Sequence, residues 1–156
     1  MRRLTIALLA FALVGCVAPV SPRSAPSDET AVVRVVDGDT IVVAIGGTRG
    51  TKVRLIGIDT PERDRCFFEA ATQRMRALVE GKSVRLDRDV SETDRYGRLL
   101  RYVYRGTTFV NAVMVREGFA NAATYPPDVA HASEFVALAR AARIAKRGLW
   151  AGGCPK

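Results

Sequence analysis

Apolar residues between positions 31 and 104 occur in five runs without helical period, and these runs predict β-strands. Short turns containing Gly separate the first three runs, which is typical of an antiparallel meander. The predicted strands are Ala31–Val36, Thr40–Ile45, Lys52–Ile58, Ser83–Asp89 and Leu99–Tyr104. With a helix after the third strand, they predict an α+β fold built on a five-stranded Greek-key barrel of the OB type with three α-helices.

Two longer segments have apolar residues at helical spacing. Cys66–Glu80 carries one apolar face, and Gly81 follows where a C-cap belongs. A second helix is predicted after Asp128, its expected N-cap, and ends at Gly148. Its expected core stripe is Phe135, Leu138, Ala142, Ala145 and Leu149.

A third, shorter helix is predicted over Ala112–Glu117, and Gly118 ends it. Asn111 is expected to cap this helix, because its side chain can accept a hydrogen bond from a free N–H of the first turn. Val110 and Val115 would form a hydrophobic staple at the same end.

The first thirty residues have the composition of a leader and a tether. Arg2 and Arg3 precede a short apolar run that ends in Leu-Val-Gly-Cys at Cys16, which resembles a bacterial lipobox. An ordinary secretory signal with a chance Cys is the alternative. The expected organisation is a signal peptide over 1–15, a Pro- and Ser-rich tether over 16–30 that is lipid-anchored at Cys16, and one domain over 31–156. Either interpretation predicts an exported protein, and the lipobox predicts a cell-envelope lipoprotein.

The net charge limits the classes of partner that the protein can bind, but it does not identify one. The chain has 24 Lys and Arg residues against 16 Asp and Glu residues, a formal net charge of +8. Twenty of the cationic residues are Arg, whose guanidinium group suits bidentate phosphate contact. Such a basic domain suits nucleic acid, an anionic membrane surface or another polyanion.

The strongest chemical signal is the stretch Val53–Glu62, in which Arg54 lies in an apolar strand that ends in Asp59-Thr60-Pro61-Glu62. An ion pair beside a polar turn would explain this stretch if it stood alone. Asp39, however, lies in a similar turn beside the preceding strand. Two carboxylates, a backbone carbonyl and waters would suit Ca²⁺, which accepts loose shells of oxygen ligands.

Three segments, Val36–Thr40, Val53–Glu62 and Asp94–Arg98, resemble in order and spacing the staphylococcal nuclease-like (thermonuclease) family, over roughly residues 31–150. The resemblance implies the same OB-type barrel. It also implies that Asp39, Asp59 and the carbonyl of Thr60 bind Ca²⁺. Glu62 would activate or position the attacking water, and its alternative role is a surface carboxylate paired with Arg63 or Arg65.

The same resemblance assigns substrate contacts. Arg54 and Arg98 are the candidate phosphate clamps, which would stabilise charge that develops on the phosphate. Arg95 and Tyr96 match residues that hold a terminal phosphate in the family. Tyr125 is the available tyrosine after the second helix, and it stands one position out of register with the family pattern.

Cysteine content predicts one covalent cross-link. If Cys16 is lipidated, Cys66 and Cys154 remain as an even pair in an oxidising compartment, and we expect them to form a disulfide. Two free thiols are the alternative.

The resulting hypothesis is a monomeric, calcium-dependent endonuclease. It would hydrolyse DNA, and RNA as a second substrate, with little sequence preference, and leave 3′-phosphate ends. The rival from another class is a non-catalytic OB module that tethers nucleic acid to the envelope, since OB barrels also bind single strands without chemistry. A basic structural lipoprotein is a third alternative, but it leaves the converging acids unexplained.

Overall fold

A computed structural model describes residues 29–154. The predicted signal peptide, Cys16 and nearly all of the predicted tether lie outside these residues. The elements in chain order are β1 (Glu29–Val35), β2 (Thr40–Ile45), β3 (Thr48–Leu55), β4 (Ile58–Asp59), α1 (Phe68–Val79), β5 (Ser83–Asp87), β6 (Leu99–Arg105), β7 (Thr108–Phe109), α2 (Val110–Arg116), β8 (Asn121–Ala122), α3 (Ala132–Ile144) and a 3₁₀ turn (Gly148–Trp150).

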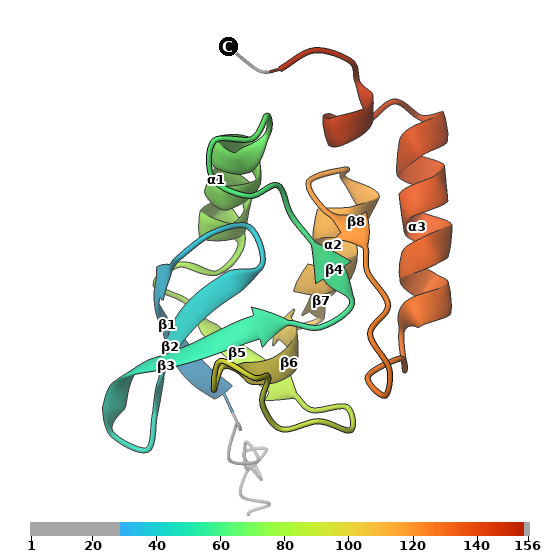
Figure 1. Ribbon diagram of the computed structural model, residues 1–156. Coiled ribbons are helices and arrows are strands. Elements are labelled where there is room, and N and C mark those ends of the chain that lie inside the picture. Colours follow the sequence, from blue (N-terminus) through green and yellow to red (C-terminus); the bar gives the residue numbers. More distant parts are fainter. Residues whose placement is uncertain (1–28, 155–156) are drawn as a thin grey trace, which may run out of the picture.

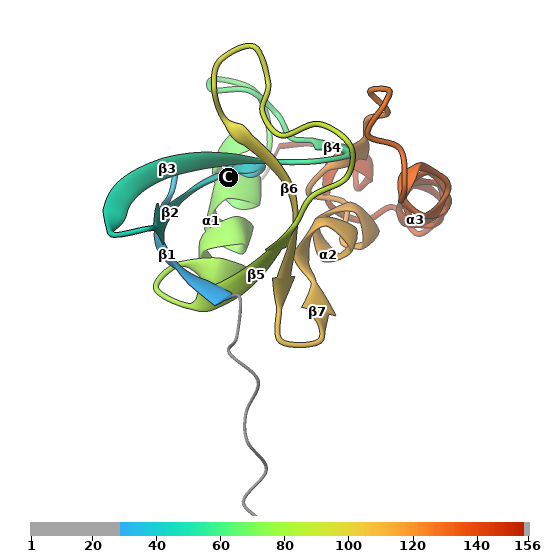
Figure 2. The same ribbon diagram turned by 90° about the horizontal axis from the view of Figure 1, so that it is seen from below.

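Five strands close into a barrel, as the sequence pattern predicts. β1, β2 and β3 form an antiparallel meander, β5 pairs with β1, and β6 pairs with β5. The barrel closes where β6 runs parallel to β3, with Val53 opposite Leu99 and Leu55 opposite Arg101. Figure 2 shows these strands as a ring with α1 behind it, and Figure 1 shows α2 and α3 side by side next to the barrel.

The barrel interior and the inner faces of the helices form one hydrophobic core. Val43, Val53 and Val103 are completely buried inside the barrel, and Met75 of α1 and Met114 of α2 are completely buried against it. The predicted apolar face of α1 is confirmed, since its buried residues include Ala71, Met75, Leu78 and Val79. This core fixes the strand ends that carry the polar residues described below.

The third strand begins and ends earlier than predicted, and its early end shapes the site. β3 ends at Leu55, and the chain turns at Ile56-Gly57, where Gly57 has a φ of +77°. A side chain at Gly57 would be strained by this φ and would also collide with the ring of Phe135. Ile58 and Asp59 then form β4, which pairs with β8 rather than with the barrel.

Both predicted N-caps are wrong. Asn111 lies inside α2, which follows Phe109, and its buried side chain accepts from the N–H of Val103 and donates to the carbonyl of Ile56. The partners of Asn111 are thus on β6 and the β3–β4 turn, where they join the helix to the barrel.

Asp128 does not cap α3 either, because that helix begins at Ala132, four residues later, with His131 at the N-cap position. The predicted hydrophobic staple of Val110 and Val115 is also wrong, because Val110 is the first residue of α2 and does not precede the helix. Phe135 and Ala142 of the predicted stripe are buried, but Ala145 is exposed beyond the end of α3.

Cys66 and Cys154 form the predicted disulfide, with 5.4 Å between their Cα atoms. The bond joins the segment that leads into α1 to the segment after the 3₁₀ turn. Among the described residues, no helix is both long and apolar enough to cross a membrane. β1 begins at Glu29, two residues before the predicted start of the domain.

Candidate active site

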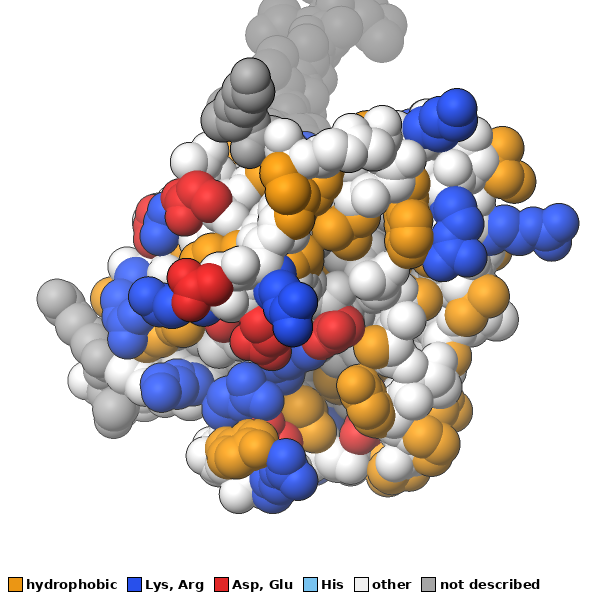
Figure 3. Space-filling model, turned by 45° about the horizontal axis from the view of Figure 1, so that its top comes forward, with side chains coloured by type: hydrophobic (Ala, Val, Ile, Leu, Met, Phe, Trp, Pro, Cys, Tyr) orange, Lys and Arg blue, Asp and Glu red, His pale blue; other side chains and the backbone are white. Residues whose placement is uncertain are grey.

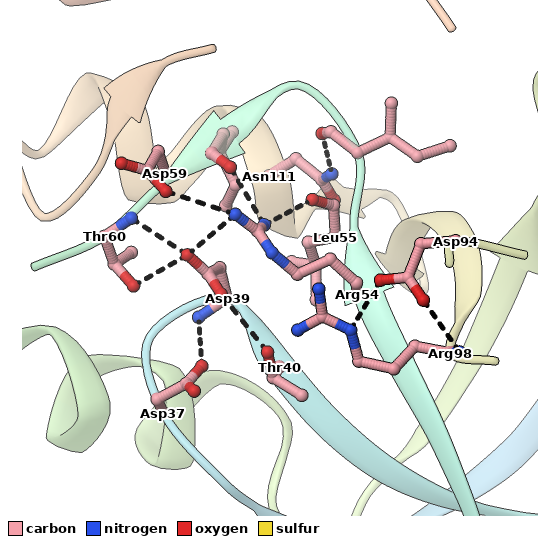
Figure 4. Close-up of polar contacts among 12 residues, drawn as sticks. Asp37, Asp39, Thr40, Arg54, Leu55, Asp59, Thr60, Asp94, Arg98 and Asn111 are labelled. Atoms are coloured by element: carbon pink, nitrogen blue, oxygen red, sulfur yellow. Dashed lines mark hydrogen bonds and ion pairs between the residues drawn. The ribbon is translucent and has the colours of Figure 1, made fainter. Parts of the chain in front are cut away.

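Arg54 is the centre of the polar cluster, and the backbone folds around its guanidinium group (Figure 4). Nη1 donates to the carbonyls of Leu55 and Ile58 at 2.8 and 2.9 Å. These carbonyls flank the turn at Ile56-Gly57, so the early end of β3 provides acceptors for the arginine. The arginine side chain is flexible, but these hydrogen bonds hold its largely buried guanidinium group in one orientation.

Two carboxylates converge on the other side of the same group. Nη2 of Arg54 lies 3.2 Å from Oδ2 of Asp39 and 3.3 Å from Oδ1 of Asp59. The N–H and hydroxyl of Thr60 both donate to Oδ2 of Asp39 at 2.9 Å, which joins the turn before β2 to the end of β4. The sequence prediction that Asp39, Arg54, Asp59 and Thr60 lie together is confirmed as geometry, and the ion pair considered as the alternative is also present.

The negative charge of the aspartates around Arg54 favours binding of an added cation. Burial, followed by the charge of Asp39, raises the pKa of Asp59, although Arg54 acts in the opposite direction. Burial and the charge of Asp39 likewise raise the pKa of Asp37. Because two carboxylates, those of Asp39 and Asp59, face the single guanidinium of Arg54, the local charge is net negative. An oxygen-only donor set with excess negative charge fits a hard cation such as Ca²⁺.

Only two carboxylates would serve such a cation directly. Within residues 29–154, no group of three or more His, Cys, Asp and Glu side chains gathers as a metal site. Any bound cation would therefore depend on backbone oxygen and water for the rest of its shell.

Arg98 reaches the cluster from the opposite side of the barrel seam. Its Nε donates to Oδ2 of Asp94 at 2.6 Å, and its backbone N–H donates to Oδ1 of the same residue at 3.0 Å. Oδ1 also accepts from the N–H of Tyr96. Asp94 thus fixes both the turn and the side chain of Arg98, which Figure 4 shows extending toward Arg54.

A pocket of about 510 Å³ brings the predicted substrate residues together. It is lined by both arginines and by three further predicted contact residues, Arg95, Tyr96 and Tyr125. Tyr96 and Tyr125 are 67% and 66% exposed, so both rings are available at the rim. Figure 3 shows Lys and Arg side chains crowded around Asp and Glu side chains on the face turned forward there.

Arg95 is held over Tyr96 rather than over the centre of the pocket. Its Nη2 donates to the hydroxyl of Tyr96 at 2.6 Å, and its guanidinium carbon lies 4.8 Å from the ring centroid. The two residues therefore form one exposed unit of cation and ring, suited to a phosphate beside a base.

Glu62 does not line this pocket, and neither do the predicted metal ligands Asp39, Asp59 and Thr60. Glu62 is exposed in the short loop between β4 and α1, and its carbonyl accepts from the N–H of Arg65. Its charge contributes to the raised pKa of Asp59, which places it near the acid cluster. Among the described residues, its carboxylate forms no ion pair with Arg63 or Arg65, so that alternative is not supported.

Sequence reasoning missed the residues that hold the site rather than form it. In the sequence, Asp94 stands out only as the first residue of the segment Asp94–Arg98, although the spacing Asp94-x-x-x-Arg98 around a Gly indicates the contact. Asn111 and Asp128 were assigned to local caps. Their true partners are distant in the sequence, and no local pattern indicates them.

The chain is similar to several nucleases. The family model for staphylococcal nuclease homologues matches residues 52–152. The thermonuclease of Staphylococcus hyicus is 34% identical over 125 residues, 76% of this chain and 73% of the relative. The micrococcal nuclease of Shigella flexneri is 38% identical over 130 residues, 76% and 71%. An uncharacterized endonuclease of Escherichia coli O157:H7 is 39% identical over 126 residues, 80% and 78%. The matched family range includes Arg54, Asp59 and Arg98.

Proposed function

Because this chain belongs to the staphylococcal nuclease family and is a nuclease, we propose that it is a calcium-dependent endonuclease acting on DNA, and on RNA as a second substrate. The observation that carries the proposal is the convergence of Asp39 and Asp59 on Arg54, beside a pocket that also contains Arg98.

The proposed reaction is an attack of water on the phosphorus atom. Asp39, Asp59 and the Thr60 carbonyl would hold Ca²⁺, whose charge would stabilise the negative charge that develops on the phosphate. Arg54 and Arg98 donate to the phosphate oxygens from the two sides of the seam. Glu62 accepts a proton from the attacking water. The bond from phosphorus to the 5′ oxygen breaks and this oxygen takes up a proton from solvent, so the products carry a 3′-phosphate and a 5′-hydroxyl.

Arg95, Tyr96 and Tyr125 bind the substrate in this proposal. The Arg95–Tyr96 unit contacts a terminal phosphate, and Tyr125 supplies an aromatic surface at the rim of the pocket. The short loop after Glu62 leaves the site open, which suits entry of a polynucleotide rather than of a closed small substrate.

We further propose that the protein acts outside the cytoplasm as a monomer anchored by a lipid on Cys16. The support is the leader composition of residues 1–16 and the Leu-Val-Gly-Cys sequence. The disulfide between Cys66 and Cys154 agrees with an oxidising compartment.

The decisive experiment follows cleavage of single-stranded DNA by the full chain in a mild nonionic detergent. Reactions contain Ca²⁺, Mg²⁺ or a chelator, and they include Glu62→Gln and Arg98→Ala. We expect cleavage with Ca²⁺ only, and a loss of about 10²–10³-fold or more in kcat in both variants. Glu69→Gln and Arg140→Ala, exposed residues of α1 and α3, are matched controls that should keep wild-type rates. Binding of DNA without cleavage under every metal condition would instead support the tethered binding module.

A further inference from the structure

Two loops line the pocket, and each carries part of the predicted substrate contact. The first, residues 88–98, is here called the arginine loop because it carries Arg95 and Arg98. The second, residues 123–131, is here called the tyrosine loop because it carries Tyr125. Neither loop contains a helix or a strand of its own, so specific side-chain contacts must set the distance between them.

Asp128 of the tyrosine loop reaches across to the arginine loop. Its Oδ1 accepts from the N–H of Val90 at 3.0 Å and from the N–H of Ser91 at 2.8 Å. The residue is only 7% exposed and lines the pocket. Burial alone would raise the pKa of Asp128, but the hydrogen bonds from Ser91 and Val90 outweigh it and lower this pKa. The carboxylate is therefore held as an anion by donors on the facing loop.

Asp89 makes the reverse connection. Its Oδ2 accepts from the N–H of Ala130 on the tyrosine loop at 2.9 Å and from the hydroxyl of Tyr102 at 2.9 Å. Tyr102 lies on β6 and is nearly fully buried, so it joins this carboxylate to the barrel. Each loop thus supplies one aspartate that accepts backbone N–H groups of the other loop. Among the described residues, neither aspartate takes part in an ion pair.

The remaining contacts of the arginine loop join it to β6 or to itself, and they include the ion pairs of Glu92 with Arg88 and Arg101. Thr93 pairs with Leu99, the N–H of Leu100 donates to the carbonyl of Glu92, and Asp94 holds Arg98. These contacts fix the position of Arg98 relative to β6. None of them connects the arginine loop to Tyr125.

We infer that Asp89 and Asp128 form a reciprocal clasp that sets the separation of the two loops and thereby positions Tyr96 and Tyr125 for substrate binding. Both residues are positioning residues, since they act through the loops and not on the phosphate. The inference rests on the proposed nuclease function. It assigns the clasp to substrate affinity rather than to the chemical step, because Arg98 has separate anchors.

The test is steady-state cleavage of single-stranded DNA by the full chain with saturating Ca²⁺. For Asp128→Ala and Asp89→Ala we expect KM to rise about tenfold while kcat stays within about threefold of wild type. Asp128→Asn keeps an acceptor oxygen and should restore KM to within about threefold of wild type. The double alanine variant should resemble each single variant, because both residues hold the same pair of loops.

The control is Asp87→Ala, which removes an acid one residue before the arginine loop and should leave KM unchanged. Thermal melting of every variant separates lost folding from lost positioning, and Asp128→Asn provides the test if the alanine variants do not fold. An unchanged KM in an active, folded Asp128→Ala protein would overturn the clasp, and so would a fall in kcat at constant KM. Failure of the wild-type protein to cleave would overturn the proposed function instead.

Discussion

At the scale of single residues, the site is built from charged groups that are already partnered. Arg54 donates to two carbonyls and faces two carboxylates, and Arg98 is held by Asp94. A guanidinium fixed in this way needs little reorganisation when a phosphate arrives, which is the condition for electrostatic stabilisation of a transition state. Lysine could not replace Arg54, because one ammonium group cannot reach acceptors on both sides of the planar fork.

The Asp94–Arg98 contact makes stability depend on pH. Burial would raise the pKa of Asp94, but hydrogen bonds from Arg98 and Tyr96 outweigh it and lower this pKa from an ordinary value of 3.8. A lowered folded-state pKa gives stability that is fully present above the unfolded pKa and is lost as pH falls through the folded-state value. Asp94→Asn should therefore lower the free energy of unfolding by about 1.5 kcal/mol at pH 7, and by much less at pH 3.

Urea unfolding of both proteins at the two pH values measures this difference. Asp87→Asn is the control, since Asp87 pairs with Arg85 at a more exposed position and should change stability by less than about 1 kcal/mol. An equal loss of stability in Asp94→Asn at pH 3 and pH 7 would contradict the assignment.

The same scale shows why sequence reasoning succeeded at some residues and failed at others. Arg54 and Asp59 were found because their contact spans five positions and a Pro marks the strand end. Asp128 was assigned to a helix cap because aspartate is common there, whereas its partners Val90 and Ser91 lie 38 and 37 positions away. A local preference cannot show that a distant backbone offers better donors.

At the scale of elements, the position of the active site depends on where each strand stops. The apolar run through Ile58 predicted one strand, yet Gly57 breaks it and lets β4 pair with β8. The break turns Asp59 toward Arg54 and places Phe135 against the turn. α1 was predicted within two residues at each end, because its apolar period is maintained along the whole helix.

The disulfide is the element-scale contact with the largest expected effect on stability. It closes a span of 88 positions between the start of α1 and the end of the described chain. Constraining so long a loop in the unfolded state stabilises the fold by about 4 kcal/mol in the chain-entropy model. The Cys66→Ala/Cys154→Ala variant should therefore unfold at clearly lower urea concentration than the oxidised protein. Reduced wild-type protein is the matched control and should behave like the variant, and coincident curves for oxidised and reduced protein would exclude the effect.

At the scale of the whole molecule, net charge and barrel closure decide what the protein can do. The net charge of +8 favours association with a polyanion over the whole surface. Three arginines line the pocket, so the attraction is strongest there. The composition predicted a polyanionic partner but not its position. The parallel pairing of β3 and β6 was likewise not visible in any local pattern.

Salt dependence tests the electrostatic part of this picture. Each phosphate contact with a single strand contributes about 0.7 to the slope of log KM against log salt concentration. Arg95→Ala should therefore reduce the slope by about 0.7, because Arg95 lies at the rim with Tyr96 and pairs with no acid among the described residues. Arg140→Ala on α3 should leave the slope unchanged. Identical slopes for wild type and Arg95→Ala would mean that this residue contacts no phosphate.

The pairing of β3 with β6 also determines when the complete pocket can form during synthesis. Arg54 precedes the seam on β3, whereas Arg98 comes immediately before β6, so the two meet only after residues 99–101 pair with 53–55. A nascent chain that lacks β6 carries both acids and Arg54 but no second clamp and no complete pocket. Cleavage that needs both arginines is therefore expected only after the last barrel strand has docked.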